Sequence, residues 1–258
     1  MTLQEIPFEF SSDRDVTIRG KLITPTTYEG DSYPVVVMLS GDGTKGTKSD
    51  TWVNVPKMLV SRGIASFLFD FQGLGYSDGE RRKLTLSVGL SNLRDAMGQL
   101  RTFEQVDQQR IGLFGSSFGG NIAILYAGDA PELKCVGVKS PVSFYPDSFY
   151  SEYGDGDLSR WAQNGYLDNI GFEYSFYLDA FRHNTYGAAM KIRCPCLITH
   201  GTSDNVVPLI QSKHLLAALR NASTRRLEIF EGIGHGYSEP GAWERMAALF
   251  VNWFAHTL

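Results

Sequence analysis

The sequence predicts an α/β protein with a mainly parallel sheet and one helical insertion. Short apolar runs, typical of strands buried on both faces, alternate with longer helix-like segments over residues 34–138. The alternation resumes over residues 194–256, whereas residues 141–190 contain no buried-strand run. Because strand–helix–strand units form right-handed crossovers, the two alternating regions are expected to build one sheet with helices on both faces.

Eight strands are expected in this sheet. Residues 4–24 alternate apolar and polar side chains and predict two strands, paired as an antiparallel hairpin at one edge. Six apolar runs predict the other strands, at residues 34–39, 64–70, 111–114, 135–138, 194–200 and 226–230. Helices are predicted over residues 50–62, 86–104, 118–129, 208–220 and 240–256.

Length and composition fit a single large domain with an insertion. The chain has 258 residues, of which 43% are hydrophobic and 20% charged, as in ordinary globular proteins. We expect residues 1–140 and 191–258 to form a core domain and residues 141–190 to form a cap, or lid. The break in alternation indicates the insertion, which is too long for a plain loop.

Charge and cysteine content exclude several classes of partner. The net charge of -4 argues against nucleic acid, whose phosphates require a basic face. Residues 1–7 lack the basic start of a signal peptide, and no apolar run reaches the length of a membrane span. We therefore expect a cytoplasmic protein. The cysteines have no zinc-ligand spacing and are expected to be free thiols; they are Cys135, Cys194 and Cys196.

One stretch, residues 111–123, combines an apolar strand, a glycine turn and an apolar helix. At its centre lies Gly115-x-Ser117-x-Gly119. This pattern is typical of a nucleophile elbow, in which the serine occupies a strained strand-to-helix turn. A side chain at either glycine would collide across so sharp a turn. The pattern predicts Ser117 as a nucleophile at the carboxyl end of the sheet, with Ser116 as an uninvolved neighbour.

A serine nucleophile needs a base within hydrogen-bond reach, and His235 is the best placed of five histidines. It lies in a glycine-rich turn directly after the last predicted strand, at the same end of the sheet as Ser117. His200 ends a strand at that edge and is the rival. The remaining histidines are expected to be surface or packing residues; they are His183, His214 and His256.

The base in turn needs a carboxylate to orient it, and Asp204 stands in the loop after the strand at 194–200. An aspartate here often caps the following helix. Pro208 is the better start for that helix, however, which leaves Asp204 in the loop. The chain order of the three residues is then Ser117, Asp204 and His235.

With this order the chain resembles the α/β-hydrolase superfamily. The resemblance covers nearly everything except the insertion, whose position and composition are similar to the helical lid of bacterial cinnamoyl and feruloyl esterases. It implies the α/β-hydrolase fold, with a mainly parallel eight-stranded sheet, helices on both faces and a helical cap. Four motifs carry it: Gly115-x-Ser117-x-Gly119, residues 70–77, His200-Gly201-x-x-Asp204 and Gly234-His235-Gly236.

The resemblance also implies an oxyanion hole made of two backbone N–H groups. One belongs to Phe118, which follows the nucleophile, and the other to the loop after the third strand. There Asp42 is the expected donor and Gly43 the alternative. The chain departs from many relatives by having Ser40-Gly41 in place of His-Gly. Because a carboxylate would oppose a developing oxyanion, the Asp42 side chain is expected to point away, toward the lid or a hydroxylated substrate.

Two further features are given structural roles. Asp70 and the glycine-rich loop after it are expected to brace the sheet edge. The glycine-rich stretches are not expected to bind phosphate, because none has the Walker lysine or a complete Gly-x-Gly-x-x-Gly followed by an acidic residue. The cap holds 13 aromatic residues between positions 144 and 186, which either form a small core or also line an acyl or alcohol pocket. It carries seven acidic residues against two arginines, which disfavours strongly anionic substrates such as coenzyme A thioesters.

These observations predict a serine hydrolase that cleaves carboxylic esters of small molecules, with an apolar or aromatic acyl or alcohol group. In this hypothesis Ser117 attacks the carbonyl, His235 transfers the proton and Asp204 orients His235. No metal or cofactor is needed. The same three residues would also serve an acyl-thioester hydrolase or a small-peptide hydrolase. The non-enzymatic alternative is a binding module on a hydrolase fold.

Overall fold

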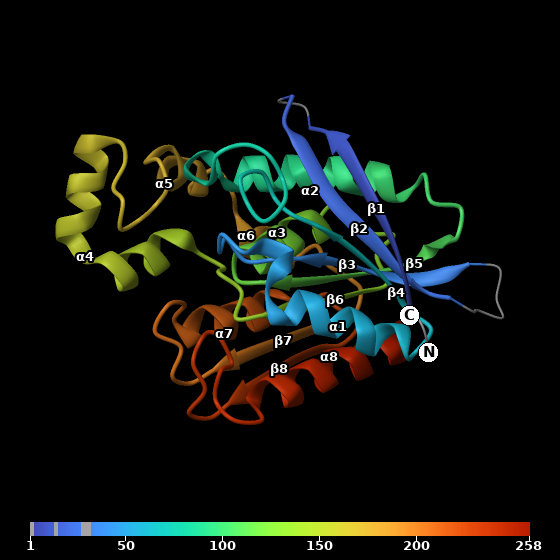
Figure 1. Ribbon diagram of the computed structural model, residues 1–258. Coiled ribbons are helices and arrows are strands. Elements are labelled where there is room, and N and C mark those ends of the chain that lie inside the picture. Colours follow the sequence, from blue (N-terminus) through green and yellow to red (C-terminus); the bar gives the residue numbers. More distant parts are fainter. Residues whose placement is uncertain (1–2, 13–14, 27–31) are drawn as a thin grey trace.

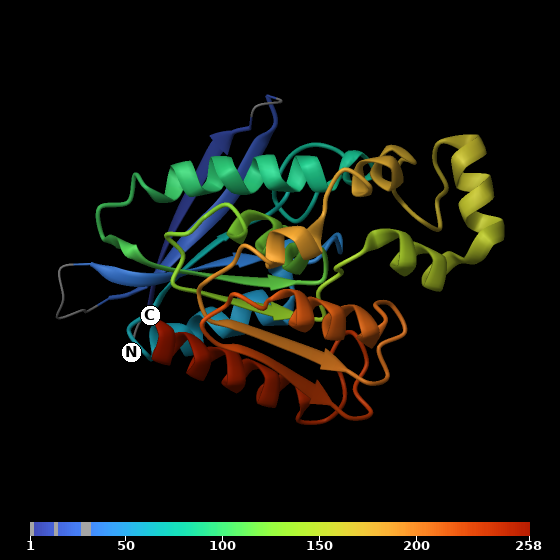
Figure 2. The ribbon, with the colours of Figure 1, turned by 180° about the vertical axis from the view of Figure 1, so that it is seen from behind.

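The computed structural model describes residues 3–12, 15–26 and 32–258 and contains one sheet with helices on both faces (Figures 1 and 2). Residues 1–2, 13–14 and 27–31 lie outside the described residues, so part of the predicted hairpin at residues 4–24 is not described. The eight strands found among the described residues are β1 (Leu3–Ser11), β2 (Thr17–Pro25), β3 (Tyr33–Leu39), β4 (Ala65–Phe69), β5 (Val106–Ser116), β6 (Cys135–Lys139), β7 (Cys196–Gly201) and β8 (Arg225–Phe230).

The strand order is β1-β2-β4-β3-β5-β6-β7-β8. Strand β2 pairs antiparallel with both β1 and β4, and all other neighbours pair in parallel. This confirms the predicted mainly parallel sheet with an antiparallel hairpin at one edge. Strand β5 begins at Val106, five residues before the predicted start. The apolar pattern did not indicate its first half because that half is mostly polar and partly exposed, whereas its second half is buried.

Two hydrophobic clusters occupy the two faces of the sheet. One face is covered by α2 (Leu86–Leu100), α3 (Phe118–Ala127) and α7 (Leu209–Ala218), and the other by α1 (Asp50–Val60) and α8 (Ala242–Thr257). Helix α3 is buried along nearly its whole length because it contacts β5, α2 and the insertion helix α6 (Thr185–Ala189). Its sequence is accordingly apolar all round.

Residues 141–190 lie between β6 and β7 and are helical. They contain α4 (Tyr145–Asn164), α5 (Ser175–Ala180) and α6. Figures 1 and 2 show α4 and α5 extending beyond the carboxyl ends of β7 and β8. Helix α4 bends at Gly154, whose backbone (φ 68°, ψ 174°) is not helical. That conformation is open almost only to glycine.

The aromatic residues of this insertion pack on one another. Phe149 is 4% exposed, and its ring contacts five others, those of Tyr145, Tyr153, Trp161, Phe176 and Tyr177. The Trp161 indole donates a hydrogen bond to the Phe172 carbonyl. The aromatics therefore pack together, in a cluster that is continuous with the hydrophobic core on one face of the sheet.

Gln211 and Ser87 are among the polar side chains that attach the insertion to the rest of the chain. The buried side chain of Gln211, on α7, accepts from the N–H groups of Ser143 and Phe144 and donates to the Phe144 carbonyl and to Ser148 Oγ. On α2, Ser87 donates its N–H and its hydroxyl to the Asp179 carboxylate at 2.8 and 2.6 Å. Both ends of the insertion are therefore fixed through hydrogen bonds to core helices.

Candidate active site

Ser117 lies in the turn between β5 and α3, with φ 53° and ψ -114°. A positive φ is uncommon for a residue other than glycine and marks local strain. A Cβ on Gly115 would lie 2.3 Å from the Gly119 carbonyl oxygen, and a Cβ on Gly119 would lie 2.3 Å from the Leu39 carbonyl oxygen. The predicted need for glycine at both positions is therefore confirmed. The turn holds the Ser117 side chain where β5 ends.

Asp204 and His235 come together at the same edge, from the loops after β7 and β8. His235 Nδ1 lies 2.8 Å from Asp204 Oδ2. Asp204 Oδ1 accepts from the N–H groups of Val206 and Val207, so the same carboxylate also braces its loop before α7. Burial alone would raise the pKa of Asp204, but hydrogen bonds from His200 and His235 outweigh it and hold that pKa well below its ordinary value.

His200 is fully buried behind Asp204. Its Nε2 lies 2.9 Å from the Val207 carbonyl and 3.3 Å from Asp204 Oδ2, and its Nδ1 lies 2.7 Å from Ser212 Oγ. Because a carbonyl can only accept, Nε2 carries the proton and Nδ1 accepts from the serine hydroxyl. The ring therefore supports the carboxylate from the protein interior, on the side away from the cavity.

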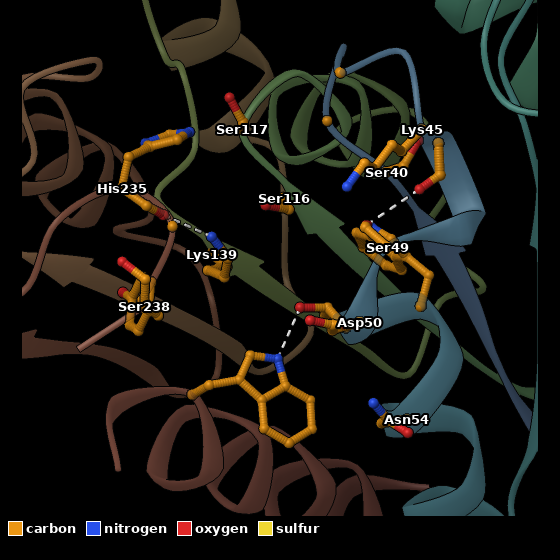
Figure 3. A pocket seen from close by; sticks show the side chains of 18 of the residues that line it. Ser40, Lys45, Ser49, Asp50, Asn54, Ser116, Ser117, Lys139, His235 and Ser238 are labelled. Carbon is orange, nitrogen blue, oxygen red and sulfur yellow. Dashed lines mark hydrogen bonds between the residues drawn. The ribbon is translucent and has the colours of Figure 1, made fainter. Parts of the chain in front are cut away.

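Ser117 and His235 face a shared cavity of about 1060 Å³ (Figure 3). Figure 3 shows the Ser117 hydroxyl and the His235 ring at its upper end, with Ser116 below them. In the described part of the chain no hydrogen bond joins Ser117 to His235. The cavity runs between the loop after β3 and the loop after β8, and no residue of 141–190 lines it. The aromatics of the insertion therefore do not form the wall of this cavity.

Lys139, the last residue of β6, lies beneath the histidine and was not anticipated from the sequence. Its ammonium group donates to the His235 carbonyl at 2.8 Å and lies 4.7 Å from the centre of the Tyr237 ring. Burial lowers its pKa to about 8, against the attraction of Asp204. A lysine that ends the otherwise apolar run 135–139 was the signal available in the sequence.

The loop after β3 lies against the elbow. A Cβ on Gly41 would be 3.5 Å from Ser117 Cβ, so residue 41 packs directly on the turn that holds Ser117. Phe118 is the first residue of α3, and its N–H has no partner within the helix. The Asp42 carboxylate faces Arg81, with Oδ2 3.8 Å from Nη2. Arg81 is the second residue that sequence reasoning missed, because it lies in a run of exposed charges.

Asp70 ties the loops beside the site together. Its carboxylate accepts from the Thr47 N–H at 2.6 Å, the Thr47 hydroxyl at 3.0 Å and the Tyr76 N–H at 2.9 Å. A Cβ on Gly46 or on Gly75 would strike this carboxylate. Burial raises the pKa of Asp70, and these hydrogen bonds oppose the rise. The bracing role predicted for the loop is therefore confirmed.

Helix α4 brings further polar groups toward this edge. Burial raises the pKa of Glu152, a hydrogen bond with Tyr153 opposes the rise, and the charges of Asp42 and His235 act on it in opposite directions. The Tyr145 hydroxyl is buried and has no hydrogen-bond partner among the described residues. The charge of Asp42 also raises the pKa of Tyr145, so both α4 residues lie within its electrostatic reach.

The described residues contain no group of three or more His, Cys, Asp or Glu side chains arranged to hold a metal ion. The three cysteines are free; Cys135 and Cys196 are buried and Cys194 is partly exposed. Within the same residues, no helix has the length and apolar character required to cross a bilayer.

A protein family and a curated relative match most of this chain. The prolyl oligopeptidase family matches residues 52–258. An uncharacterized 31.7 kDa protein of Escherichia coli, from the traX-finO intergenic region, is 22% identical over 277 residues, which cover 91% of this chain and 95% of that protein.

Two solved structures show the same fold. Est1E from Butyrivibrio proteoclasticus, with ferulic acid bound, has a TM-score of 0.78 at 20% identity and covers 97% of this chain and 98% of its own. Alpha/beta hydrolase domain-containing protein 10 from mouse has a TM-score of 0.76 at 18% identity and covers 99% of both chains. These likenesses confirm the α/β-hydrolase fold predicted from the four motifs.

Proposed function

This chain belongs to the prolyl oligopeptidase family, and we propose that it is a serine hydrolase that cleaves carboxylic esters of small molecules. The observation that carries the proposal is the 2.8 Å contact between Asp204 and His235, beside a strained Ser117 on the same cavity. A serine, a histidine and a buried carboxylate at one sheet edge are the parts of a nucleophile, a base and an orienting group.

In the proposed reaction Ser117 Oγ attacks the ester carbonyl carbon while His235 Nε2 takes the hydroxyl proton. The negative charge on the carbonyl oxygen is stabilised by the N–H groups of Phe118 and Asp42. His235 then gives the proton to the departing alkoxide, which leaves as an alcohol. Water attacks the acyl-enzyme with His235 again as base, releasing the acid and restoring Ser117. Asp204 stabilises the imidazolium in both halves of the reaction.

We propose that residues 141–190 are a cap over one side of this site, and that the substrate has an apolar or aromatic acyl or alcohol group. The rings of Tyr145 and Phe176 pack against Phe118, the residue next to the nucleophile, with centroids 6.5 and 6.1 Å apart. Phe118 and Phe176 are fully buried and Tyr145 is 5% exposed, so an acyl group would contact these rings only if the cap moved away from α3. The acidic residues of the cap favour neutral over strongly anionic substrates.

A small-peptide hydrolase is the second candidate, because the matching family is one of peptidases. An acyl-thioester hydrolase would use the same three residues. The experiment that separates these functions measures kcat/KM for aryl esters of increasing chain length, acyl thioesters and aminoacyl amides. We expect neutral aryl esters to be the best substrates. Equal rates on an acyl-CoA and on a neutral ester of the same acyl group would contradict the ester proposal.

Covalent labelling separates an enzyme from a binding module. A fluorophosphonate should label the wild type at Ser117, and Ser117→Ala should abolish the labelling. Ser116→Ala is the matched control, since it alters the neighbouring serine in the same turn and should still be labelled. A wild-type chain that is neither labelled nor active on the whole panel would identify a binding module.

A further inference from the structure

A single guanidinium group, that of Arg81, joins the loop after β3 to the cap. Its Nε donates to the Asp42 carbonyl at 2.8 Å, and its Nη1 donates to the Gly171 carbonyl at 3.2 Å. The guanidinium carbon lies 4.1 Å from the centre of the Phe172 ring, which is buried in the cap. Arg81 therefore contacts two segments that are 129 positions apart in the sequence.

Two glycines make room for Arg81, one for its side chain and one for its backbone. Gly171 has φ 74°, and a Cβ there would lie 2.4 Å from Arg81 Nη1. Gly73 has φ 75°, and a Cβ there would lie 2.3 Å from the Arg81 N atom. Gly171 thus leaves room for the Arg81 guanidinium, and Gly73 leaves room for the Arg81 backbone. Arg82, by contrast, points outward and pairs with Glu80 and Glu173 at the surface.

The Asp42 end of this contact lies beside the nucleophile, because Gly41 packs on Ser117. Arg81 donates to the Asp42 carbonyl and lies 3.8 Å from the Asp42 carboxylate. These two contacts hold residue 42 in one conformation. The guanidinium also offsets a negative charge that would otherwise oppose a developing oxyanion. Both effects hold whether the donor is the N–H of Asp42 or that of Gly43, since both flank the fixed carbonyl.

We propose that Arg81 is a positioning residue that sets the oxyanion loop and makes its geometry depend on the cap. This inference rests on the proposed function, because it assigns the loop after β3 to transition-state stabilisation. Arg81 itself does not contact the reacting atoms. Its loss should therefore weaken binding of the tetrahedral transition state much more than binding of the substrate.

The first test removes the guanidinium. Arg81→Ala should lower kcat for an aryl ester by about 10-fold to 100-fold, part of the ~10²–10³ that one oxyanion donor supplies, with a smaller change in KM. The inhibition constant of an alkyl trifluoromethyl ketone, which forms a tetrahedral adduct with serine, should rise in proportion. Arg81→Lys should recover only part of the rate, because an ammonium group lacks the planar pair of donors. Added guanidinium ion, far below denaturing concentrations, should raise the kcat of Arg81→Ala toward the wild-type value, and urea should not.

Arg82→Ala is the matched control for this change. It removes the adjacent arginine from the same short 3-10 helix, η2 (Arg81–Lys83), and its kcat should stay within about two-fold of the wild-type value. Equal kcat values for Arg81→Ala and Arg82→Ala would overturn the inference. The inference would also be overturned if kcat/KM of Arg81→Ala fell only through a rise in KM. If Arg81→Ala does not fold, Arg81→Lys and the cap variant described next decide the question.

The second test moves the cap contact and leaves Arg81 in place. Gly171→Ala introduces a Cβ against Nη1, whereas Gly165→Ala introduces one at the same φ of 74° with no atom within 4 Å. We expect Gly171→Ala to lower kcat and Gly165→Ala to leave it unchanged. In an Arg81→Ala background, Gly171→Ala should lower kcat no further. Additive losses in the double variant, or equal losses in both glycine variants, would overturn the coupling to the cap.

The outcomes separate this inference from the proposed function. If the wild type hydrolyses esters and is labelled at Ser117 but Arg81 variants behave like Arg82 variants, only the inference fails. If the wild type shows neither hydrolysis nor labelling, the proposed function fails first and the inference with it.

Discussion

Two clusters in this chain each contain a serine, a histidine and an aspartate, and they differ in what the aspartate binds. In the first, Asp204 contacts the His235 ring, and among the described residues it makes no hydrogen bond with the Ser117 hydroxyl. In the second, the Ser87 hydroxyl donates to Asp179 at 2.6 Å and lies 3.0 Å from His183 Nε2. Because Ser87 already gives its proton to the carboxylate, its oxygen can only accept from His183.

The contrast shows that composition does not define a catalytic site. Ser117 lies in a strained turn on a cavity, whereas Ser87 lies in the first turn of α2 and holds α5 in place. The same residue types are proposed to catalyse a reaction in the first cluster, whereas in the second they attach α5 to α2. What distinguishes them is the direction of the hydrogen bonds and access to a ligand.

The largest difference between the clusters is expected in serine variants. Ser117→Ala should lower kcat/KM for an aryl ester by about 10⁴-fold or more, because the nucleophile is lost. Ser87→Ala should keep most of the activity, and Ser116→Ala should keep measurable turnover. Initial rates of hydrolysis with protein of verified fold would check this. Comparable losses in Ser87→Ala and Ser117→Ala would remove the distinction between the clusters.

Lys139 supports only the first cluster, so its loss should affect activity next most strongly. Lys139→Met removes the donor to the His235 carbonyl and should lower kcat by about 10-fold to 100-fold through misplacement of the base. Lys134→Met, which changes an exposed lysine just before β6, is the control. If both variants retain wild-type kcat, Lys139 does not position the histidine.

Lys139→Met should also change how the free energy of unfolding depends on pH. The Lys139 pKa is lowered to about 8 in the folded chain, whereas an unfolded lysine titrates near pH ~10.4. Between these values the unfolded state binds more protons, so this residue makes the free energy of unfolding rise with pH. Urea titrations across that window should show a smaller rise in Lys139→Met than in the wild type. An identical slope would mean that Lys139 is not desolvated.

The second cluster should matter for stability more than for catalysis. Burial would raise the pKa of Asp179, but hydrogen bonds from His183 and Ser87 hold it well below its ordinary value. Its stabilisation is therefore complete above the unfolded pKa of about 4 and is lost as pH falls below it. Asp179→Asn should lower the free energy of unfolding by about 1–3 kcal/mol at neutral pH and by less in acid.

Urea unfolding near neutral pH and in acid, alongside ester hydrolysis, checks this prediction. The exposed Asp168→Asn is the matched control within the cap and should change stability by less than about 0.5 kcal/mol. A loss for Asp179→Asn that is the same at both pH values would show that the carboxylate charge contributes nothing.

The smallest effect is expected inside the cap itself. Gly154→Ala places a side chain on the non-helical residue of α4 and should lower the free energy of unfolding by about 1 kcal/mol. Gly156→Ala, two residues on in helical conformation, should raise it by up to about 1 kcal/mol. Neither added Cβ would meet an atom within 4 Å, so the pair isolates backbone conformation. Equal melting temperatures would show that the bend in α4 is not maintained in solution.

Local patterns in the sequence were enough to predict the sheet, the helices of the core and the glycines of the elbow. Asp204 and His235 were predicted to meet because each follows a parallel strand, and such strands end at one edge. The contacts of Lys139, Arg81 and Ser87 were not predicted. Lys139 and His235 are 96 residues apart, and Ser87 and Asp179 are 92 apart.

These long-range contacts leave no periodic trace in the sequence. Arg81 and Arg82 are adjacent and equally basic, yet only Arg81 points inward. The Arg81 guanidinium lies against Gly171, a contact that exists only once the loops and the insertion are folded. The cap likewise shows its aromatic content in the sequence but not which rings face Phe118. Side-chain direction in loops is a property of tertiary packing, which local propensity does not encode.

The two outer strands of the sheet have a consequence for how copies of the chain meet one another. Glu5 and Glu9 on β1 pair with Lys21 and Arg19 on β2, and the β8 edge carries Arg225 and the exposed pair Arg226–Glu228. An unpaired strand edge is a template for aggregation, and charged side chains are a common protection against it. A second copy adding to either edge would have to desolvate these charges. We therefore expect them to disfavour edge-to-edge aggregation at high concentration.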